Sequence, residues 1–245
     1  MNEEILPSAM MKAGECILPD GTDMKYRLFV PECEEEIPVV VYLHGSGFRG
    51  SDNLIQIDNG YICHFLSDEK CIVFAPQCPS GKTWMGTENI GVPQDRLFDY
   101  NSLGESPNCA FLKEFTDGIA EKYNGDKCRI YLIGRSMGAH TIWRLMQMYP
   151  EWAAANVSVA GGADLSYAEI YKDKNIWMFQ GTDDTIVPST TAEKIYLTLV
   201  NMGSDKIRLN MYEGADHMSV DEYASKNDEM YKWMFSQRNL SGGEK

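Results

Sequence analysis

The pentapeptide Gly134-Arg135-Ser136-Met137-Gly138 sets a serine hydroxyl between two glycines, where it could act as a nucleophile. The residues before it, 128–133, form an apolar run typical of a buried strand. After it, apolar residues recur at helical spacing as far as Pro150. A serine on such a sharp strand-to-helix turn exposes its hydroxyl, and the flanking glycines let strand and helix approach closely. The motif therefore predicts that Ser136 is a catalytic nucleophile.

A serine hydroxyl is a weak nucleophile until a base takes its proton, and histidine is the usual base. His217 stands in a turn that directly follows an apolar strand, where its imidazole can reach over a sheet. His140 lies one helical turn beyond Ser136, and we expect a packing or helix-surface role for it. His64 lies in an apolar stretch and is also expected to pack. The pattern favours His217 as the general base.

A catalytic histidine needs a carboxylate that fixes its tautomer. Two adjacent aspartates, Asp183 and Asp184, follow the strand expected over residues 175–179. Asp184 stands four residues before Pro188, a spacing that suits a loop folding back toward His217, and it is the favoured acid. Asp183 is the alternative, although a cap of the turn or of the following helix is its expected role.

Negative charge that develops on the carbonyl oxygen of an acyl substrate needs two preorganised hydrogen-bond donors. One is expected to be the backbone N–H of Met137, directly after the nucleophile. The other is expected from the loop after the strand at 39–43, which reads His44-Gly45-Ser46-Gly47 and whose glycines permit unusual backbone angles. Within this loop, the backbone N–H of Ser46 is the expected donor.

The elements that would position these residues alternate along the chain. A strand region at 26–30 is followed by short apolar runs, typical of strands buried on both faces, at 38–43, 71–76, 128–133, 156–160, 175–179 and 206–212. Helical patterns lie between them, the last marked by apolar residues from Tyr223 to Met234. The alternation predicts an α/β fold, a three-layer α/β/α sandwich around a mostly parallel sheet. At 245 residues the chain is expected to form one domain, 1–245.

One segment, residues 79–108, is too long for an ordinary connection and is rich in Gly, Pro, Asn, Asp and Ser. The strand before it is expected to run parallel to the nucleophile strand. Gln77 and the residues after it should therefore emerge at the carboxyl edge of the sheet, where open α/β sheets bind ligands. We expect a substrate-side loop, with Gln77 and Trp84 as substrate-binding residues. For Trp84, a place in the core is the alternative to an apolar wall against the substrate.

The composition narrows the classes of partner. The formal net charge of −14 disfavours nucleic acid and anionic membrane surfaces. No stretch approaches the ~20 apolar residues of a membrane span, and the first residues lack the pattern of a signal peptide, so we expect a cytoplasmic protein. With four scattered histidines and no C-x-x-C pair, neither a metal site nor a cofactor is expected.

Taken together, these residues resemble those of the α/β-hydrolase superfamily, and within it the bacterial phospholipase/carboxylesterase and feruloyl-esterase-like group, often labelled predicted peptidases. The resemblance covers about Tyr26 to Met234, and its chain order of serine, acid and histidine is that of the superfamily. Relatives often carry glycine where Ala139 stands and histidine where Gln180 stands. The segments that carry the resemblance are 43–53, 75–79, 81–84, 134–138, 184–188 and 214–217.

The resemblance implies a serine carboxylic-ester hydrolase that works through an acyl-enzyme without a cofactor. Its implied substrates are small or aromatic acyl esters, such as acetyl or feruloyl esters of plant-derived carbohydrate. A lysophospholipase or acyl-thioesterase and a peptidase are alternatives on the same fold. A non-catalytic binding protein of this fold is less expected, because every catalytic segment is present.

Overall fold

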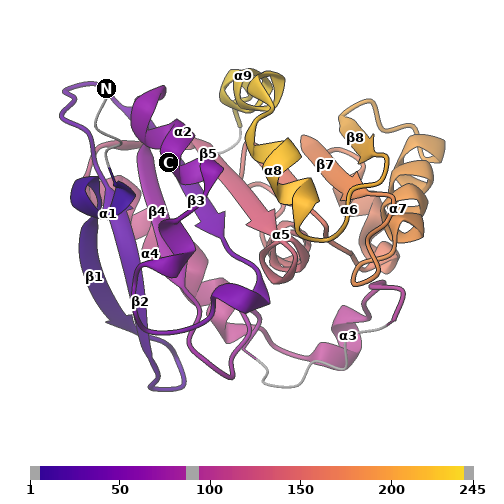
Figure 1. The fold of residues 1–245 in the computed structure, drawn as a ribbon, viewed down its shortest axis with the longest axis horizontal. Coiled ribbons are helices and arrows are strands. Elements are labelled where there is room, and N and C mark those ends of the chain that lie inside the picture. The colour runs from indigo at the N-terminus through magenta and orange to yellow at the C-terminus, as the bar shows by residue number, and fades with distance from the viewer. Residues whose placement is uncertain (1–5, 87–93, 240–245) are drawn as a thin grey trace.

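A computed structural model describes residues 6–86 and 94–239, which form one sheet of eight strands in the order β1-β2-β4-β3-β5-β6-β7-β8 (Figure 1). Strand β2 runs antiparallel to both of its neighbours, β1 and β4, whereas all other neighbouring strands are parallel. The bounds are β1 Lys12–Ile17, β2 Asp23–Phe29, β3 Ile37–Leu43, β4 Ile72–Gln77, β5 Gly125–Arg135, β6 Ala155–Val159, β7 Ile176–Gly181 and β8 Ile207–Tyr212.

The central strands are apolar on both faces because helices cover both sides of the sheet. In β3, every residue is buried. Val39 and Val41 face one hydrophobic core, while Val40 and Tyr42 between them face the other, as the two-residue repeat of a strand requires. The predicted three-layer α/β architecture is confirmed.

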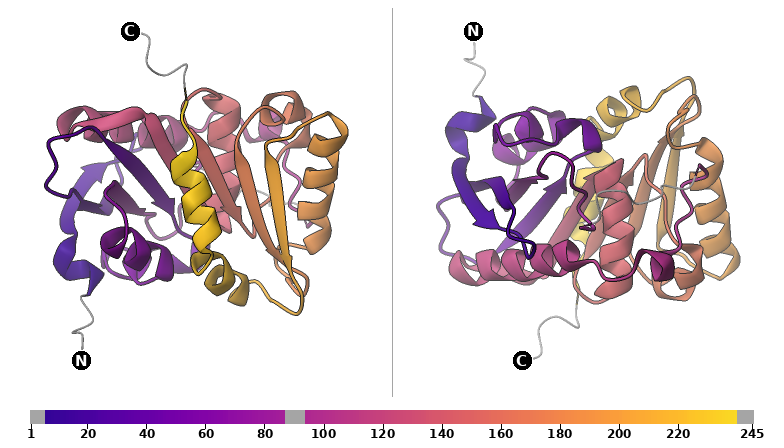
Figure 2. Two further views of the ribbon diagram at one scale, coloured as in Figure 1. Left: turned by 90° about the horizontal axis from the view of Figure 1, so that it is seen from above. Right: turned by 90° about the horizontal axis from the view of Figure 1, so that it is seen from below.

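Two groups of helices form the outer layers, and the two panels of Figure 2 look onto them from opposite sides. Helices α4, α5, α6 and α7 pack on the first core, and α2, α8 and α9 pack on the second. The helix bounds are α1 Pro7–Met10, α2 Gly60–Ser67, α3 Tyr100–Leu103, α4 Pro107–Lys122, α5 Met137–Met148, α6 Ala168–Tyr171, α7 Ser189–Asn201, α8 Ser219–Ser225 and α9 Asp228–Ser236. None of the helices within residues 6–86 and 94–239 is both long and apolar enough to cross a bilayer.

The helix expected from Tyr223 to Met234 is in fact two helices. Helix α8 ends at Ser225 and α9 begins at Asp228. The break lies at Asn227, which adopts an extended conformation and whose side chain accepts a hydrogen bond from the amide of Met230. Asparagine competes with the helical backbone for such bonds and therefore favours the start of a new helix.

The substrate-side loop predicted at 79–108 is only partly within the described residues, because 87–93 lie outside them. Its later part packs over the segments that follow the carboxyl ends of β6 and β7. The Phe98 amide donates to the Ala163 carbonyl at 3.0 Å, and the Thr191 hydroxyl donates to the Asp95 carbonyl at 2.6 Å. The described part of the loop thus borders the sheet edge where parallel α/β proteins bind ligands.

Candidate active site

Ser136 forms the turn between β5 and α5, and its backbone is strained. Its φ of 50° and ψ of −113° lie in a region that non-glycine residues rarely adopt. The neighbouring glycines are required by packing. A Cβ atom on Gly138 would lie 1.8 Å from the carbonyl oxygen of Leu43, and one on Gly134 would lie 2.5 Å from the backbone of Gly138. Strand, turn and helix therefore meet too closely for any other residue at these two positions.

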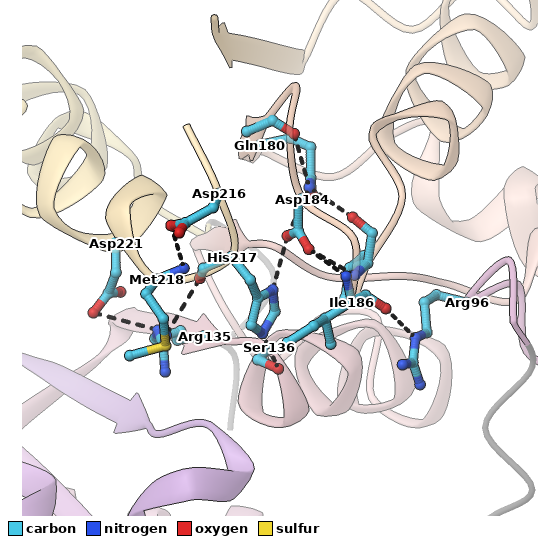
Figure 3. Close-up of polar contacts among 12 residues, drawn as sticks. Arg96, Arg135, Ser136, Gln180, Asp184, Ile186, Asp216, His217, Met218 and Asp221 are labelled. Carbon is cyan, nitrogen blue, oxygen red and sulfur yellow. Dashed lines mark hydrogen bonds and ion pairs between the residues drawn. The ribbon is translucent and has the colours of Figure 1, made fainter. Parts of the chain in front are cut away.

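The side chains of Ser136, His217 and Asp184 form one continuous hydrogen-bonded chain (Figure 3). Nε2 of His217 lies 2.9 Å from Oγ of Ser136, and Nδ1 lies 2.7 Å from Oδ2 of Asp184. They come from three turns at the carboxyl edge of the sheet, after β5, β8 and β7. All three residues are at least nine-tenths buried. A histidine held in this way can accept the serine proton while the carboxylate fixes its tautomer.

The Asp184 carboxylate is fully occupied by donors. Its Oδ1 accepts from the amides of Ile186 at 2.9 Å and Val187 at 2.8 Å, and its Oδ2 accepts from Gln180 Nε2 at 3.0 Å as well as from His217. Burial alone would raise the pKa of this carboxyl, but the hydrogen bonds from His217 and the two amides lower it below its ordinary value of 3.8. Asp184 is therefore ionised at neutral pH.

Asp183 makes no hydrogen bond to His217 among the described residues. It is exposed, and its carboxylate accepts from the Thr182 hydroxyl at 3.1 Å. The expectation that Asp183 caps the turn or the following helix is wrong. Asp184 itself accepts from the turn amides, and α7 begins without a side-chain cap.

The loop expected to supply an oxyanion donor lies against the nucleophile turn. A Cβ atom on Gly45 would come within 3.3 Å of the Ser136 Cβ, which explains the glycine. Ser46 is the first residue of a short 3-10 helix, Ser46–Phe48, and Met137 is the first residue of α5. First-turn amides have no acceptor inside their own helix. Neither of these two amides has an acceptor among the described residues, so both are available to a ligand oxygen.

His44 anchors this loop, a role that was not expected from the sequence. Its Nε2 accepts from the Cys78 amide at 2.9 Å, its Nδ1 lies 2.7 Å from the Gly45 carbonyl, and its own carbonyl accepts from Trp84 Nε1 at 3.0 Å. The residue is fully buried, and burial lowers the pKa of its imidazole to about 4. His44 is therefore a neutral structural link between the ends of β3 and β4.

The structure buries the two residues expected to bind substrate. Trp84 is 2% exposed and lies in the first core, packed edge-on to His44. Gln77 is also buried, with its side chain accepting from the Asn53 amide at 2.7 Å and donating to the Phe48 carbonyl at 3.3 Å. Both side chains are used in internal contacts beneath residues 44–53. Their placement favours support of this loop, and for Trp84 it favours the place in the core that the sequence left as the alternative.

His140 has the packing role expected of it. Its Nδ1 accepts from the Gly162 amide at 2.7 Å, and its ring contacts that of Phe98 at a centroid distance of 4.8 Å. Burial lowers the pKa of this imidazole to about 3. It thus stays neutral beside the site and fixes the turn after β6.

Comparison with solved structures places this geometry in a known fold. The chain superposes on a thermostable esterase with a TM-score of 0.81 and 31% sequence identity, covering 94% of this chain and 64% of that one. The chain has the fold of the α/β-hydrolase superfamily. The chain also matches an S-formylglutathione hydrolase from Agrobacterium tumefaciens, with a TM-score of 0.67 and 16% identity over 93% of this chain and 95% of that one. A ferulic acid esterase matches with a TM-score of 0.65 and 16% identity over 92% and 97%.

The chain thus spans less than two thirds, 64%, of the length of the thermostable esterase. Searches against protein-family models and against curated proteins gave no match. The two structures at 16% identity show a similarity of fold only.

Gln180 is a site residue whose role the sequence did not reveal. It stands where relatives often carry histidine, and its Nε2 donates to the Val187 carbonyl at 2.9 Å as well as to Asp184. The side chain therefore connects the end of β7 to both ends of the acidic turn. Its departure from the usual residue was a signal, but only the contacts show that it supplies an N–H group to Asp184.

The buried neutral histidines predict how stability depends on pH. The unfolded chain takes up protons at these two positions near pH 6.5, whereas folded His44 and His140 resist protonation down to about 4 and about 3. Their contribution to the unfolding free energy is therefore present above pH 6.5 and is lost progressively as the pH falls toward 4. We expect His140→Asn to flatten part of this decline in urea unfolding curves recorded from pH 7 to 4. An unchanged slope in that variant would contradict the prediction.

Proposed function

We propose that this hydrolase cleaves carboxylic esters through an acyl-enzyme. The observation that carries the proposal is the unbroken chain of hydrogen bonds from Ser136 through His217 to Asp184, at 2.9 Å and 2.7 Å. A serine alone would be unreactive, and a histidine alone would have no fixed tautomer. Their joint burial at the carboxyl edge of the sheet meets the requirements for nucleophilic catalysis.

In the first step of the proposed mechanism, Oγ of Ser136 forms a bond to the ester carbonyl carbon while His217 Nε2 takes the hydroxyl proton. The tetrahedral intermediate collapses as the bond to the alcohol oxygen breaks, and the imidazolium passes its proton to the leaving alcohol. Water then attacks the acyl carbon while His217 takes its proton, the bond to Oγ of Ser136 breaks, and the imidazolium returns the proton to Oγ as the acid leaves. Asp184 stays ionised throughout and stabilises the imidazolium, in line with its lowered pKa.

The amides of Ser46 and Met137 are the proposed oxyanion donors. Both are first residues of helices, and neither has an acceptor among the described residues. Donors of this kind can be aimed at the oxygen before the reaction starts, so little reorganisation is needed when its charge develops.

Small or aromatic acyl esters are the proposed substrates. Two apolar side chains next to the catalytic residues are open to solvent, Ile186 at 49% exposure and Met218 at 60%. Figure 3 draws them on opposite sides of His217, so an apolar acyl or alcohol group could lie between them. An esterase and a ferulic acid esterase among the similar structures support the same class.

Two measurements test this proposal. A fluorophosphonate probe should label the protein at Ser136, located by peptide mass spectrometry, and absence of that label would favour a non-catalytic binding protein. Hydrolysis of acetyl, butyryl, octanoyl and feruloyl esters should then favour the acetyl or feruloyl compounds. Preference for octanoyl esters or for thioesters would instead indicate a lysophospholipase or thioesterase, and turnover of peptides alone would indicate a peptidase.

Trp84→Ala should destabilise the protein strongly, because it deletes a buried indole from the core. Truncation of a buried aromatic side chain costs about 3–5 kcal/mol of unfolding free energy. We expect turnover of acetyl and feruloyl esters to fall together, since the loop that holds Ser46 loses its support. Urea unfolding and kcat/KM for both esters measure these effects. Trp84→Phe is the matched control, which retains a ring but removes the N–H bonded to His44. A loss confined to feruloyl esters, with unchanged stability, would restore the substrate-wall interpretation.

A further inference from the structure

Arg135 is the second residue of the serine motif and the last residue of β5, and the proposed chemistry does not use it. Although charged, it is only 3% exposed. Burying a guanidinium is costly unless its charge and its N–H groups find partners. The partners of Arg135 come from two loops that carry proposed catalytic groups.

The first partner is the histidine turn. Nη2 of Arg135 donates to the backbone carbonyl of His217 at 3.3 Å and to Sδ of Met218 at 2.8 Å (Figure 3). Nε of Arg135 lies 3.4 Å from Oδ2 of Asp221, in the helix that follows this turn. The arginine therefore contacts both the histidine turn, which precedes α8, and the first turn of α8 itself. In Figure 3 these contacts lie on the side of His217 opposite to Asp184.

The second partner is the loop that holds Ser46. The guanidinium carbon lies 5.4 Å from the centroid of the Phe48 ring, a cation–π contact. A Cβ atom on Gly45 would lie 3.0 Å from Nη1 of Arg135, so the loop backbone also packs directly on the guanidinium. One side chain thus links the nucleophile turn, the histidine turn and the proposed oxyanion loop.

We propose that Arg135 is a positioning residue that keeps His217 and the Ser46 loop in register with Ser136. This inference rests on the proposed function. The three turns follow different strands, and catalytic geometry tolerates misplacement of only a fraction of an ångström. The hydrogen bond to the carbonyl of His217 fixes the backbone from which the imidazole extends toward Ser136 and Asp184.

The contacts of Arg135 divide into a charge role and a geometric role. Nε of Arg135 lies 3.4 Å from Oδ2 of Asp221 but makes no hydrogen bond among the described residues, so this contact between a buried guanidinium and a partly buried carboxylate is one of charge and not of direction. The directional bonds of Arg135 go to His217 and Met218 instead. Removing the charges of Arg135 and Asp221 together therefore avoids leaving one of them without its counter-charge. The hydrogen bonds from Arg135 to the histidine turn are lost in either case.

The double variant Arg135→Met/Asp221→Asn separates the two roles. Arg135→Met alone leaves the partly buried Asp221 without its counter-charge and removes a buried guanidinium, so it should be clearly destabilised. In the double variant we expect the unfolding midpoint to recover substantially, while kcat stays roughly 10- to 100-fold below the wild type with KM changed less than about threefold. Arg135→Lys keeps the positive charge but lacks the planar guanidinium group with its several N–H donors, so it should give an intermediate kcat. This variant can be measured even if the methionine variants fold poorly.

A second arginine–aspartate pair on β5 supplies the matched control. Nε of Arg129 lies 2.7 Å from Oδ2 of Asp126, toward the amino end of the strand and away from the three turns. The double variant Arg129→Met/Asp126→Asn should leave kcat within about twofold of the wild type. Comparable kcat losses in the two double variants would overturn the inference, because the effect would then be one of general stability.

The rate of fluorophosphonate labelling distinguishes failure of this inference from failure of the proposed function. Absence of labelling at Ser136 in the wild-type protein would contradict the proposed function. If the wild type is labelled, and the double variant Arg135→Met/Asp221→Asn is labelled at the same rate and has the same kcat, only the positioning role would be overturned. We expect labelling of Ser136 in both proteins, slowed roughly tenfold or more in the double variant.

Discussion

Replacement of Ser136 by alanine should lower kcat for ester hydrolysis by about 10⁶-fold, the scale seen when a catalytic serine is removed from a serine-protease triad. The change deletes the oxygen of the proposed nucleophile, whereas His217 and the proposed backbone donors remain. The fold should persist. Alanine keeps the Cβ atom and lacks only the hydroxyl, and the strained φ of 50° at this turn is imposed by the surrounding contacts.

Hydrolysis rates and thermal unfolding measured on the same preparation check both halves of this expectation. Ser67→Ala is the matched control, because it removes a hydroxyl from the exposed end of α2, where the group donates to the Cys63 carbonyl. Activity of the Ser136 variant within tenfold of the wild type would reject Ser136 as the nucleophile. A large fall in its unfolding midpoint would show that the hydroxyl also supports the turn.

The meeting of Ser136, Asp184 and His217 could be anticipated from the sequence because each follows a short apolar strand. Parallel strands end at the same edge of a sheet, so turns far apart in the chain converge there. The glycines at 134 and 138 add a local signal, since their positions report the close approach of strand and helix. Local pattern and strand direction were sufficient for this part of the site.

Contacts made from one loop to another could not be anticipated in the same way. Gln77 and Trp84 emerge at the correct edge of the sheet, yet residues 44–53 fold over them and bury both. Arg135 contacts His217 across 82 residues of sequence, and no periodicity relates two such positions. Strand β1 was missed for a simpler reason, because it is an edge strand with mostly exposed residues and has no apolar run.

Asp184→Asn should lower kcat by roughly 10⁴-fold, as in the serine-protease template where the same substitution traps the wrong histidine tautomer. The present geometry explains why. Oδ2 of Asp184 accepts from both His217 Nδ1 and Gln180 Nε2, so an amide nitrogen at this position would face two N–H groups. An amide oxygen there would instead accept from both, but without the negative charge that stabilises the imidazolium. Either orientation weakens His217 as a base.

Asp183→Asn is the control for this prediction, because it makes the same chemical change one residue away. Asp183 is exposed, and its carboxylate hydrogen-bonds only to Thr182 among the described residues. We therefore expect the kcat of the Asp183→Asn variant to stay within about threefold of the wild type. Steady-state kinetics of both variants on one ester give the ranking directly. A larger loss in the Asp183 variant would transfer the role of acid to Asp183 and would require the turn after β7 to rearrange when substrate binds. Equal small losses would mean that His217 needs no carboxylate partner, and the 2.7 Å contact with Asp184 would then serve only to fold the turn.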